Sequence, residues 1–214
     1  MPDQIALNDE EQVIPTPIAK PFSVLIARQV SNILSPITVS IPFTILVALY
    51  HARSIVTSLA FAGATLLFMS VGPMLYILAG VRTGKFTDPE VSIRSQRSGP
   101  YAFSIISTAI GLVILSFLHE PKDLQTVMLA VIASGVLMMT ITLWWKISLH
   151  ASTAAGAVTM LAALYGNVML PAYLLVVLVC WSRVVLHRHT TAQVIAGALV
   201  SILLALVALA LRGI

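Results

Sequence analysis

Seven long apolar segments alternate with short polar breaks along this chain. The segments lie at about 30–50, 54–81, 101–118, 124–145, 151–165, 168–186 and 191–211. Most of them approach or exceed the roughly 20 apolar residues that a helix needs to cross a bilayer. They do not show the short alternating stretches that are typical of barrel strands. The pattern therefore predicts an all-α, polytopic transmembrane helix bundle with six to seven spans.

Two of these segments carry a further structural signal. Pro36 and Pro42 are expected to bend the first segment, because proline interrupts helical hydrogen bonding. The segment 151–165 is short for a span and is rich in Ala, Gly, Ser and Thr. Small residues let membrane helices approach one another closely. We therefore expect this helix to lie buried at the centre of the bundle.

Composition agrees with a membrane protein built as one domain. Only 9% of the residues are charged, against about 25% in soluble domains. Residues 1–21 are polar, acidic and proline-rich, and they lack the basic and apolar regions of a cleavable signal. We interpret them as a flexible tail before a single transmembrane domain over 22–214. The net charge of +4 fits membrane flanks or an anionic ligand better than nucleic acid, so the expected partner is a membrane lipid.

If every segment spans the bilayer, the polar breaks alternate between its two sides. The breaks at 82–100, 146–150 and 182–190 then share one side, called the motif face below, and those at 51–54, 119–123 and 166–167 share the other. The motif face carries Lys20, Arg28, Arg82, Lys85, Arg94, Arg97, Lys146, Arg183 and Arg188, and the opposite face carries Arg53, Lys122 and Arg212. An excess of Lys and Arg in short loops marks the cytoplasmic side. The motif face of this multi-pass protein is therefore predicted to be cytoplasmic.

The motif face also gathers the residues that can carry chemistry. They are Asp88, Glu90, Arg94, Arg97 and Pro100 in DPEVSIRSQRSGP, Ser148 and His150 in KISLH, and Ser182, Arg183, His187, Arg188, His189 and Gln193 in SRVVLHRHTTAQ. Arginine forks bind phosphate oxygens in pairs, and a neutral imidazole is a nucleophile. If the third cluster continues as a helix, Gln193 lies one turn after His189 and can fix its tautomer. These clusters predict a site for a phosphate ester, and no cofactor is expected.

The order and spacing of the clusters resemble the type 2 phosphatidic acid phosphatase superfamily, a group of metal-independent membrane lipid phosphatases. Ser182-Arg183, five residues and His189 match its SR-x5-H third motif. Ser148-Leu149-His150 looks like the core of its PSGH second motif, and the loop with Arg97 and Pro100 occupies the place of its first motif. The resemblance covers roughly residues 82–200.

The resemblance implies a role for each matched residue. His189 is the expected nucleophile, which forms a phosphohistidine, and His150 is the expected general acid for the leaving alcohol. The expected ligands of the phosphoryl oxygens are Arg97, Arg183, Arg94 and Ser148.

Three features of the sequence depart from the family pattern. Lys85 lies nine residues before Arg94 and twelve before Arg97, where the first motif has a separation of seven. Ile147 and Leu149 replace the proline and glycine of the second motif. Gln193 replaces the aspartate that follows the third-motif histidine, and residues 124–214 contain no acid. The candidate acids that could orient His189 are therefore Asp88 and Glu90, in the loop 82–100.

The favoured function is removal of phosphate from a lipid phosphate or an isoprenoid (di)phosphate. Because Gln193 replaces the aspartate of the family, an alternative is a non-catalytic, phosphatase-like membrane subunit or a lipid-binding protein. An intramembrane prenyltransferase is less favoured. Such enzymes bind magnesium diphosphate through paired aspartate-rich motifs, and the loops of this chain contain one Asp-x-Glu pair, Asp88 and Glu90.

Overall fold

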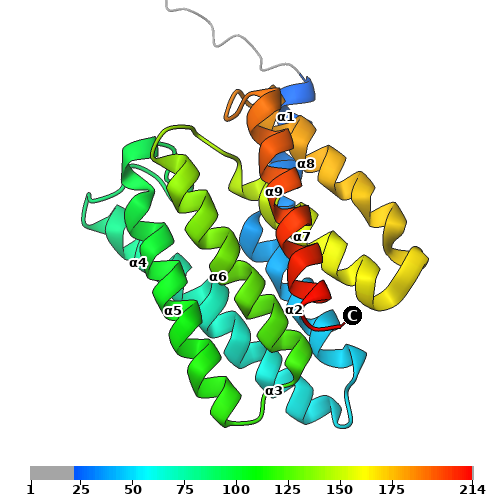
Figure 1. The fold of residues 1–214 in the computed structure, drawn as a ribbon. Coiled ribbons are helices and arrows are strands. Elements are labelled where there is room, and N and C mark those ends of the chain that lie inside the picture. The colour runs from blue at the N-terminus through cyan, green and yellow to red at the C-terminus, as the bar shows by residue number, and fades with distance from the viewer. Residues whose placement is uncertain (1–21, 214) are drawn as a thin grey trace, which may run out of the picture.

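The computed structural model describes residues 22–213, and the predicted tail lies outside the described residues. Within that range the chain is helical and contains no strand. The elements are α1 (Phe22–Ile33), α2 (Pro36–Tyr50), α3 (Ile55–Leu66), the π-helical turn η1 (Leu67–Val71), α4 (Gly72–Arg82), the 3-10 turn η2 (Arg94–Gln96), α5 (Ser98–Phe117), α6 (Lys122–Thr142), α7 (Leu149–Tyr165), the 3-10 segment η3 (Gly166–Ala172), α8 (Tyr173–Val185) and α9 (Thr191–Ala210). The predicted all-α bundle is confirmed (Figure 1).

Five helical stretches of the described chain are long and apolar enough to cross a membrane, or six if α1 and α2 form one bent span. The two helices meet at 44°. Helix α1 begins at Phe22, well before the predicted start near residue 30. The side chain of Ser35 caps α2 by accepting from the Thr38 N–H, and Pro36 stands at the first turn, where its missing N–H costs no helical bond. Of the two prolines expected to bend the first segment, Pro36 therefore starts α2 and Pro42 lies inside it.

Helices α7 and α8 form a hairpin that returns toward the motif face (Figure 1). Ala155 on α7 packs in one apolar cluster with Val176 on α8, and the Thr159 and Tyr173 hydroxyls are 2.9 Å apart. Gly166 ends α7 with φ +75°, a backbone angle that glycine adopts without a Cβ clash. The predicted segments 151–165 and 168–186 are therefore the two arms of this hairpin.

Helix α7 lies at the centre of the bundle, as the sequence predicts. Ten of its 17 residues are buried, and it packs against α2, α8 and α9. A Cβ on Gly197 of α9 would lie 2.6 Å from the carbonyl oxygen of Ser148, so only glycine permits this approach. The Ser148 N–H donates to the Gln193 carbonyl across the same gap, at 3.3 Å. Small residues thus bring the second and third motifs together.

The outer surface of the bundle is apolar, as expected for a protein in lipid. Large side chains such as Val56, Phe117, Leu174 and Leu203 are more than half exposed. Soluble monomers rarely expose apolar surface on this scale. The helices are therefore those of a multi-pass membrane protein.

Side-chain contacts confirm which polar breaks share an end of the bundle. Glu90 and Arg183 form an ion pair, which joins the loop 82–100 to the break at 182–190 at the upper end in Figure 1. His51 and Asp123 join the breaks at 51–54 and 119–123, with their side chains 2.8 Å apart. The cytoplasmic orientation of the motif face stays a prediction.

Candidate active site

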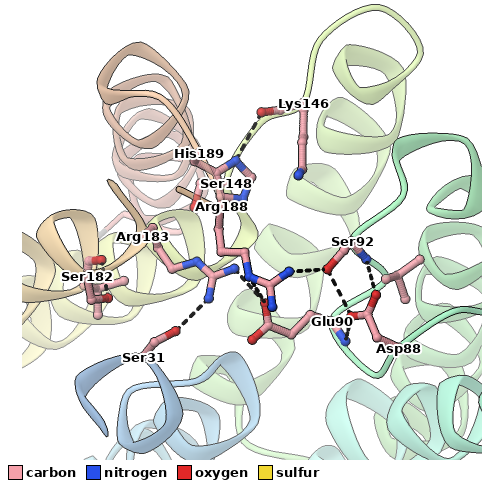
Figure 2. Close-up of polar contacts among 12 residues, drawn as sticks. Ser31, Asp88, Glu90, Ser92, Lys146, Ser148, Ser182, Arg183, Arg188 and His189 are labelled. Carbon is pink, nitrogen blue, oxygen red and sulfur yellow. Dashed lines mark hydrogen bonds and ion pairs between the residues drawn. The ribbon is translucent and has the colours of Figure 1, made fainter. Parts of the chain in front are cut away.

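The guanidinium groups of Arg183 and Arg188 both turn toward Glu90 (Figure 2). Arg183 Nη2 donates to Glu90 Oε2 at 2.8 Å, and Arg183 Nη1 donates to Ser31 Oγ at 2.6 Å. Arg188 lies farther from the carboxylate, at 3.9 Å, and donates to Ser92 Oγ. Arg183 is only 3% exposed, and its Nε finds no acceptor among the described residues. The buried guanidinium therefore keeps its Nε–H donor free.

Arg97 is the second buried arginine of the motif face, 8% exposed. It stands just before α5, where its Nε donates to the Val91 carbonyl at 2.9 Å and its Nη1 to the Ile147 carbonyl at 3.2 Å. These two bonds tie the loop 82–100 to the segment that leads into α7. Arg97 is thereby fixed beside the second motif, although 50 residues separate it from Ile147.

The third motif is a turn between two helices, as the break predicted between 168–186 and 191–211 implies, and the alternative of a continuous helix does not apply. Helix α8 ends at Val185, and the N–H groups of Arg188 and His189 both donate to the Arg183 carbonyl. His187 adopts a left-handed φ of 52° within the turn. Helix α9 then begins with a capping box, in which Thr190 and Gln193 cap each other's backbone N–H.

The predicted contact between Gln193 and His189 is nevertheless present. His189 Nδ1 lies 3.2 Å from Gln193 Oε1 and 3.3 Å from the Lys146 carbonyl oxygen. A carbonyl oxygen can only accept, so Nδ1 carries the ring proton. Gln193 Oε1 also accepts from the Thr190 N–H, which fixes the orientation of the amide. Nε2 of His189 is therefore the nitrogen with a free lone pair.

The surroundings of His189 favour the neutral imidazole. Burial lowers its pKa to about 4, helped by the positive charges of Arg97 and Arg183, while the hydrogen bond to Gln193 acts in the opposite direction. Burial and nearby cations both disfavour a second positive charge. His189 is thus unprotonated at neutral pH, the state that a nucleophile needs.

His150 and Ser148 come from the start of α7. Ser148 is fully buried and caps the helix, with its Oγ accepting from the Ala151 N–H. His150 is half-buried, and its ring makes no hydrogen bond to any residue of the described chain. Of these two predicted site residues, His150 lines the cavity described next, whereas Ser148 does not.

A cavity of about 710 Å³ opens between α2, α5, α6, α7 and α9. Its polar end is lined by Asp88, Glu90, Arg97, His150, Arg183, Arg188 and His189, and the rest of its wall is mainly apolar. Within residues 22–213, no group of three or more His, Cys, Asp or Glu side chains is placed to hold a metal ion. The cavity therefore joins a cationic, imidazole-bearing end to an apolar interior.

Residues 143–213 match the family model of the PAP2 superfamily. The match is to this C-terminal segment of the chain. It runs from the end of α6 through α9 and contains the second and third motifs, so the resemblance drawn from those motifs is confirmed. No curated protein and no solved structure matches the chain. The similarity to this superfamily supports a phosphatase-type function in general.

The two candidate acids lie in the loop before the PAP2 segment, and neither contacts His189. Asp88 accepts from the backbone N–H groups of Glu90 and Ser92, which shapes a turn. Burial raises the pKa of Glu90, but the hydrogen bond and charge of Arg183 outweigh it and hold that pKa below its usual range. Glu90 is thus an ionised partner of an arginine, and Gln193 with the Lys146 carbonyl occupies the position expected for an orienting acid.

Arg94 supports the PAP2 segment without reaching the cavity. Its Nη1 donates to the carbonyls of Thr142 and Leu143, at the end of α6. Those carbonyls are among the last of the helix, which have no partner within it. The structure therefore gives Arg94 a capping contact and places it away from the expected phosphate ligands.

Sequence analysis missed three contacts that hold the site. The first is the capping box: Thr190 and Gln193 stand three residues apart just before the apolar run of α9, which is its signature. That signal was available in the sequence. Ser31 on Arg183 and Ser92 on Arg188 had no such signal, because each pair is separated by more than 90 residues.

Proposed function

We propose that this protein is a metal-independent membrane phosphohydrolase that removes phosphate from a lipid phosphate or an isoprenoid (di)phosphate. The observation that carries the proposal is the single cavity on which Arg97, His150, Arg183 and His189 converge. The cationic end suits a phosphoryl group, and the apolar interior suits a hydrocarbon chain. Ligand sites commonly combine a mostly apolar wall with a few convergent polar groups in this way.

The first chemical step is attack by His189 on phosphorus. Its Nε2 lone pair forms the N–P bond while the bond from phosphorus to the alcohol oxygen breaks, and a phosphohistidine results. The Nδ1 proton stays on the ring, directed toward Gln193 and the Lys146 carbonyl. His150 donates a proton to the departing alcohol oxygen. In this scheme the nucleophile and the general acid are two separate histidines, so neither ring has to perform both roles.

The arginines stabilise the charge on the transferred group. Arg97 and Arg183 are both buried, and Arg183 Nε is free to donate to a phosphoryl oxygen. Fixed cations in a site of low dielectric stabilise phosphoryl transfer without a metal ion. The same two residues lower the pKa of His189, so they also keep the nucleophile neutral.

The second step returns the enzyme to its starting state. Water attacks the phosphohistidine, His150 takes the proton of that water, and the N–P bond breaks to release inorganic phosphate. His150 then again carries the proton needed for the next substrate. Both steps use the same two arginines around phosphorus, Arg97 and Arg183, so no rearrangement of the helices is required.

A second candidate is a lipid-phosphate-binding protein without turnover. It is favoured by one observation: His189 Nδ1 faces the neutral oxygens of Gln193 and Lys146, and no carboxylate among the described residues contacts the ring. A neutral acceptor orients the imidazole but stabilises the imidazolium of a phosphohistidine less than a carboxylate does.

Trapping of labelled phosphate on the protein distinguishes the two candidates. The purified protein in detergent and chelator is mixed with phosphate-labelled phosphatidic acid or farnesyl diphosphate, quenched in alkali and mapped by mass spectrometry. We expect released phosphate and label on His189, and loss of both in His189→Asn. His187→Asn is the matched control, since His187 is exposed in the same turn and does not line the cavity. Binding of either lipid without label or release would favour the second candidate.

A further inference from the structure

The cavity extends far beyond the phosphate site into the bundle. Along α7 its lining runs from His150 to Met160, ten residues that span about 15 Å at the helical rise of 1.5 Å per residue. Along α6 it runs from Met138 to Val127, a similar length. The hydrocarbon core of a bilayer is about 30 Å thick. The cavity therefore reaches about as deep as one leaflet.

The wall of this cavity offers little to a polar ligand. Phe43, Met69, Val131 and Met160 form its deeper part, together with small residues such as Ala130. Four of the lining serines form two hydrogen-bonded pairs, whereas the hydroxyls of Ser104 and Ser134, between the two ends of the lining, have no partner in the described chain. Ser70 donates to Ser40 at 2.9 Å, and the Ser152 and Ser201 hydroxyls are hydrogen-bonded across α7 and α9. The paired hydroxyls add little polarity to a mainly apolar wall, which suits a hydrocarbon chain.

The cavity ends at a packed floor. Val127, Met160 and Ala205 are the lining residues farthest from the motif face along α6, α7 and α9, and they belong to the main apolar core of the bundle. A void of about 10 Å³, too small for a hydrocarbon chain, adjoins Val127 and Met160. Leu124 and Leu209 of the same core are buried just beyond them. A chain that enters from the phosphate site therefore meets close-packed side chains about 15 Å below His150.

From this shape we infer that the hydrocarbon chain of the substrate lies inside the bundle, and that the floor limits its length. The inference rests on the proposed function, because the phosphate site anchors the head of the same molecule. An extended chain advances roughly 1.2 Å per bond, since a residue of three bonds spans about 3.6 Å, so the cavity holds a chain of about 12 carbons. Longer straight chains must bend or leave part of their length outside.

Two alanines on α6 provide a matched test. Ala130 lines the cavity, whereas Ala133 is exposed on the lipid-facing side of the same helix and does not line it. Phenylalanine at 130 fills the space that we assign to the chain, and phenylalanine at 133 projects into the membrane. The two variants carry the same change in volume and hydrophobicity, so a difference between them reports on the cavity.

Hydrolysis of dodecyl phosphate and butyl phosphate by the two variants gives the readout. We expect Ala130→Phe to lower kcat/KM for dodecyl phosphate at least about tenfold, as expected when a filled space must be repacked. Butyl phosphate turnover should change by less than about twofold, and Ala133→Phe should change neither substrate by more than that. Equal behaviour of the variants, or equal loss of both substrates by a folded Ala130→Phe, would overturn the inference. Hydrolysis of neither substrate by the unaltered protein would instead count against the proposed function.

Photolabelling tests the position of the chain without any turnover and without a variant. Dodecyl phosphate with a diazirine at its terminal carbon is irradiated with the unaltered protein, with and without excess dodecyl phosphate. We expect competed label on the floor residues Val127, Met160 and Ala205. Label confined to lipid-facing residues such as Ala133 and Leu203 would show that the chain lies outside the bundle, whatever the activity of the protein.

Discussion

The PAP2 segment and the loop 82–100 both supply the site, but they hold their residues by different means. In the PAP2 segment, helix caps and a tight turn set the backbone at Ser148 and His189 through contacts between near neighbours, and the distant Lys146 carbonyl adds a contact to the His189 ring. In the loop, Arg94 and Arg97 reach backbone carbonyls 48 and 50 residues away. Local contacts require a fixed number of residues between the motif positions. A long side chain that reaches across the bundle does not require such a fixed number.

This difference accounts for the spacing of two motifs. The third motif has the family spacing, whereas the first motif does not. The SR-x5-H spacing is the length of the turn itself, because the Arg183 carbonyl accepts from the N–H of His189. Lys85, by contrast, donates to Tyr76 and lies over its ring, away from the cavity. The loop thus delivers Arg97 to the site without the lysine spacing of the first motif.

Replacing each loop arginine by alanine is the strongest test of this comparison. Arg97→Ala and Arg94→Ala each leave carbonyl oxygens without a donor, so both should lose stability by about 1–3 kcal/mol. Only Arg97→Ala should lower kcat/KM further, by about a hundredfold, because only Arg97 lines the cavity. Thermal unfolding and lipid phosphate hydrolysis measure the two effects. A similar loss of activity in both variants would remove Arg97 from the site.

A charge at position 193 tests how the PAP2 segment orients its nucleophile, with a smaller expected effect. Gln193→Glu keeps the capping box and places a carboxylate at His189 Nδ1. We expect a several-fold faster reaction, because a carboxylate stabilises the imidazolium of the phosphohistidine better than an amide does. Gln193→Leu should be slower by about tenfold, the effect of losing one hydrogen bond.

The pH dependence of kcat/KM in the same variants shows in which direction the substitution moves the pKa of His189. His189 attacks only when neutral, and its pKa is about 4, so kcat/KM should stay high at neutral pH and fall as the pH drops through about 4. A carboxylate at 193 favours the protonated ring and raises that pKa, so the fall should begin at higher pH in Gln193→Glu. An unshifted acid limb in this variant would mean that another group controls it.

The smallest effect is expected from Glu90, which links the loop to the PAP2 segment. Its carboxylate pairs with the guanidinium that we assign to the phosphate, so it competes with an incoming anion. Glu90→Gln should tighten competitive inhibition by inorganic phosphate about threefold, a modest change because the carboxylate is one-third exposed. Asp88→Asn is the control, since Asp88 contacts no arginine in the described chain. Weaker inhibition in Glu90→Gln would show that Glu90 serves mainly to position Arg183.

The sequence alone was sufficient for the features that depend on local patterns. Long apolar segments indicated the membrane bundle, and the small residues of 151–165 predicted the buried position of α7. Parity of the spans predicted that the loop 82–100 would meet the second and third motifs. These three predictions share one physical reason. Apolar side chains are costly in water, and unpaired backbone groups are costly in lipid, so each segment adopts a helix and enters the membrane independently of the others.

Only the tertiary structure decided the partners of the charged side chains. Glu90 could have oriented His189, but it pairs with Arg183, and Arg94 caps α6 when it could have faced a phosphate. Long flexible side chains have several acceptors within reach, and the choice depends on which backbone carbonyls and cavities the packed helices bring near. That choice is made by distances across the bundle, which no pattern along the chain records.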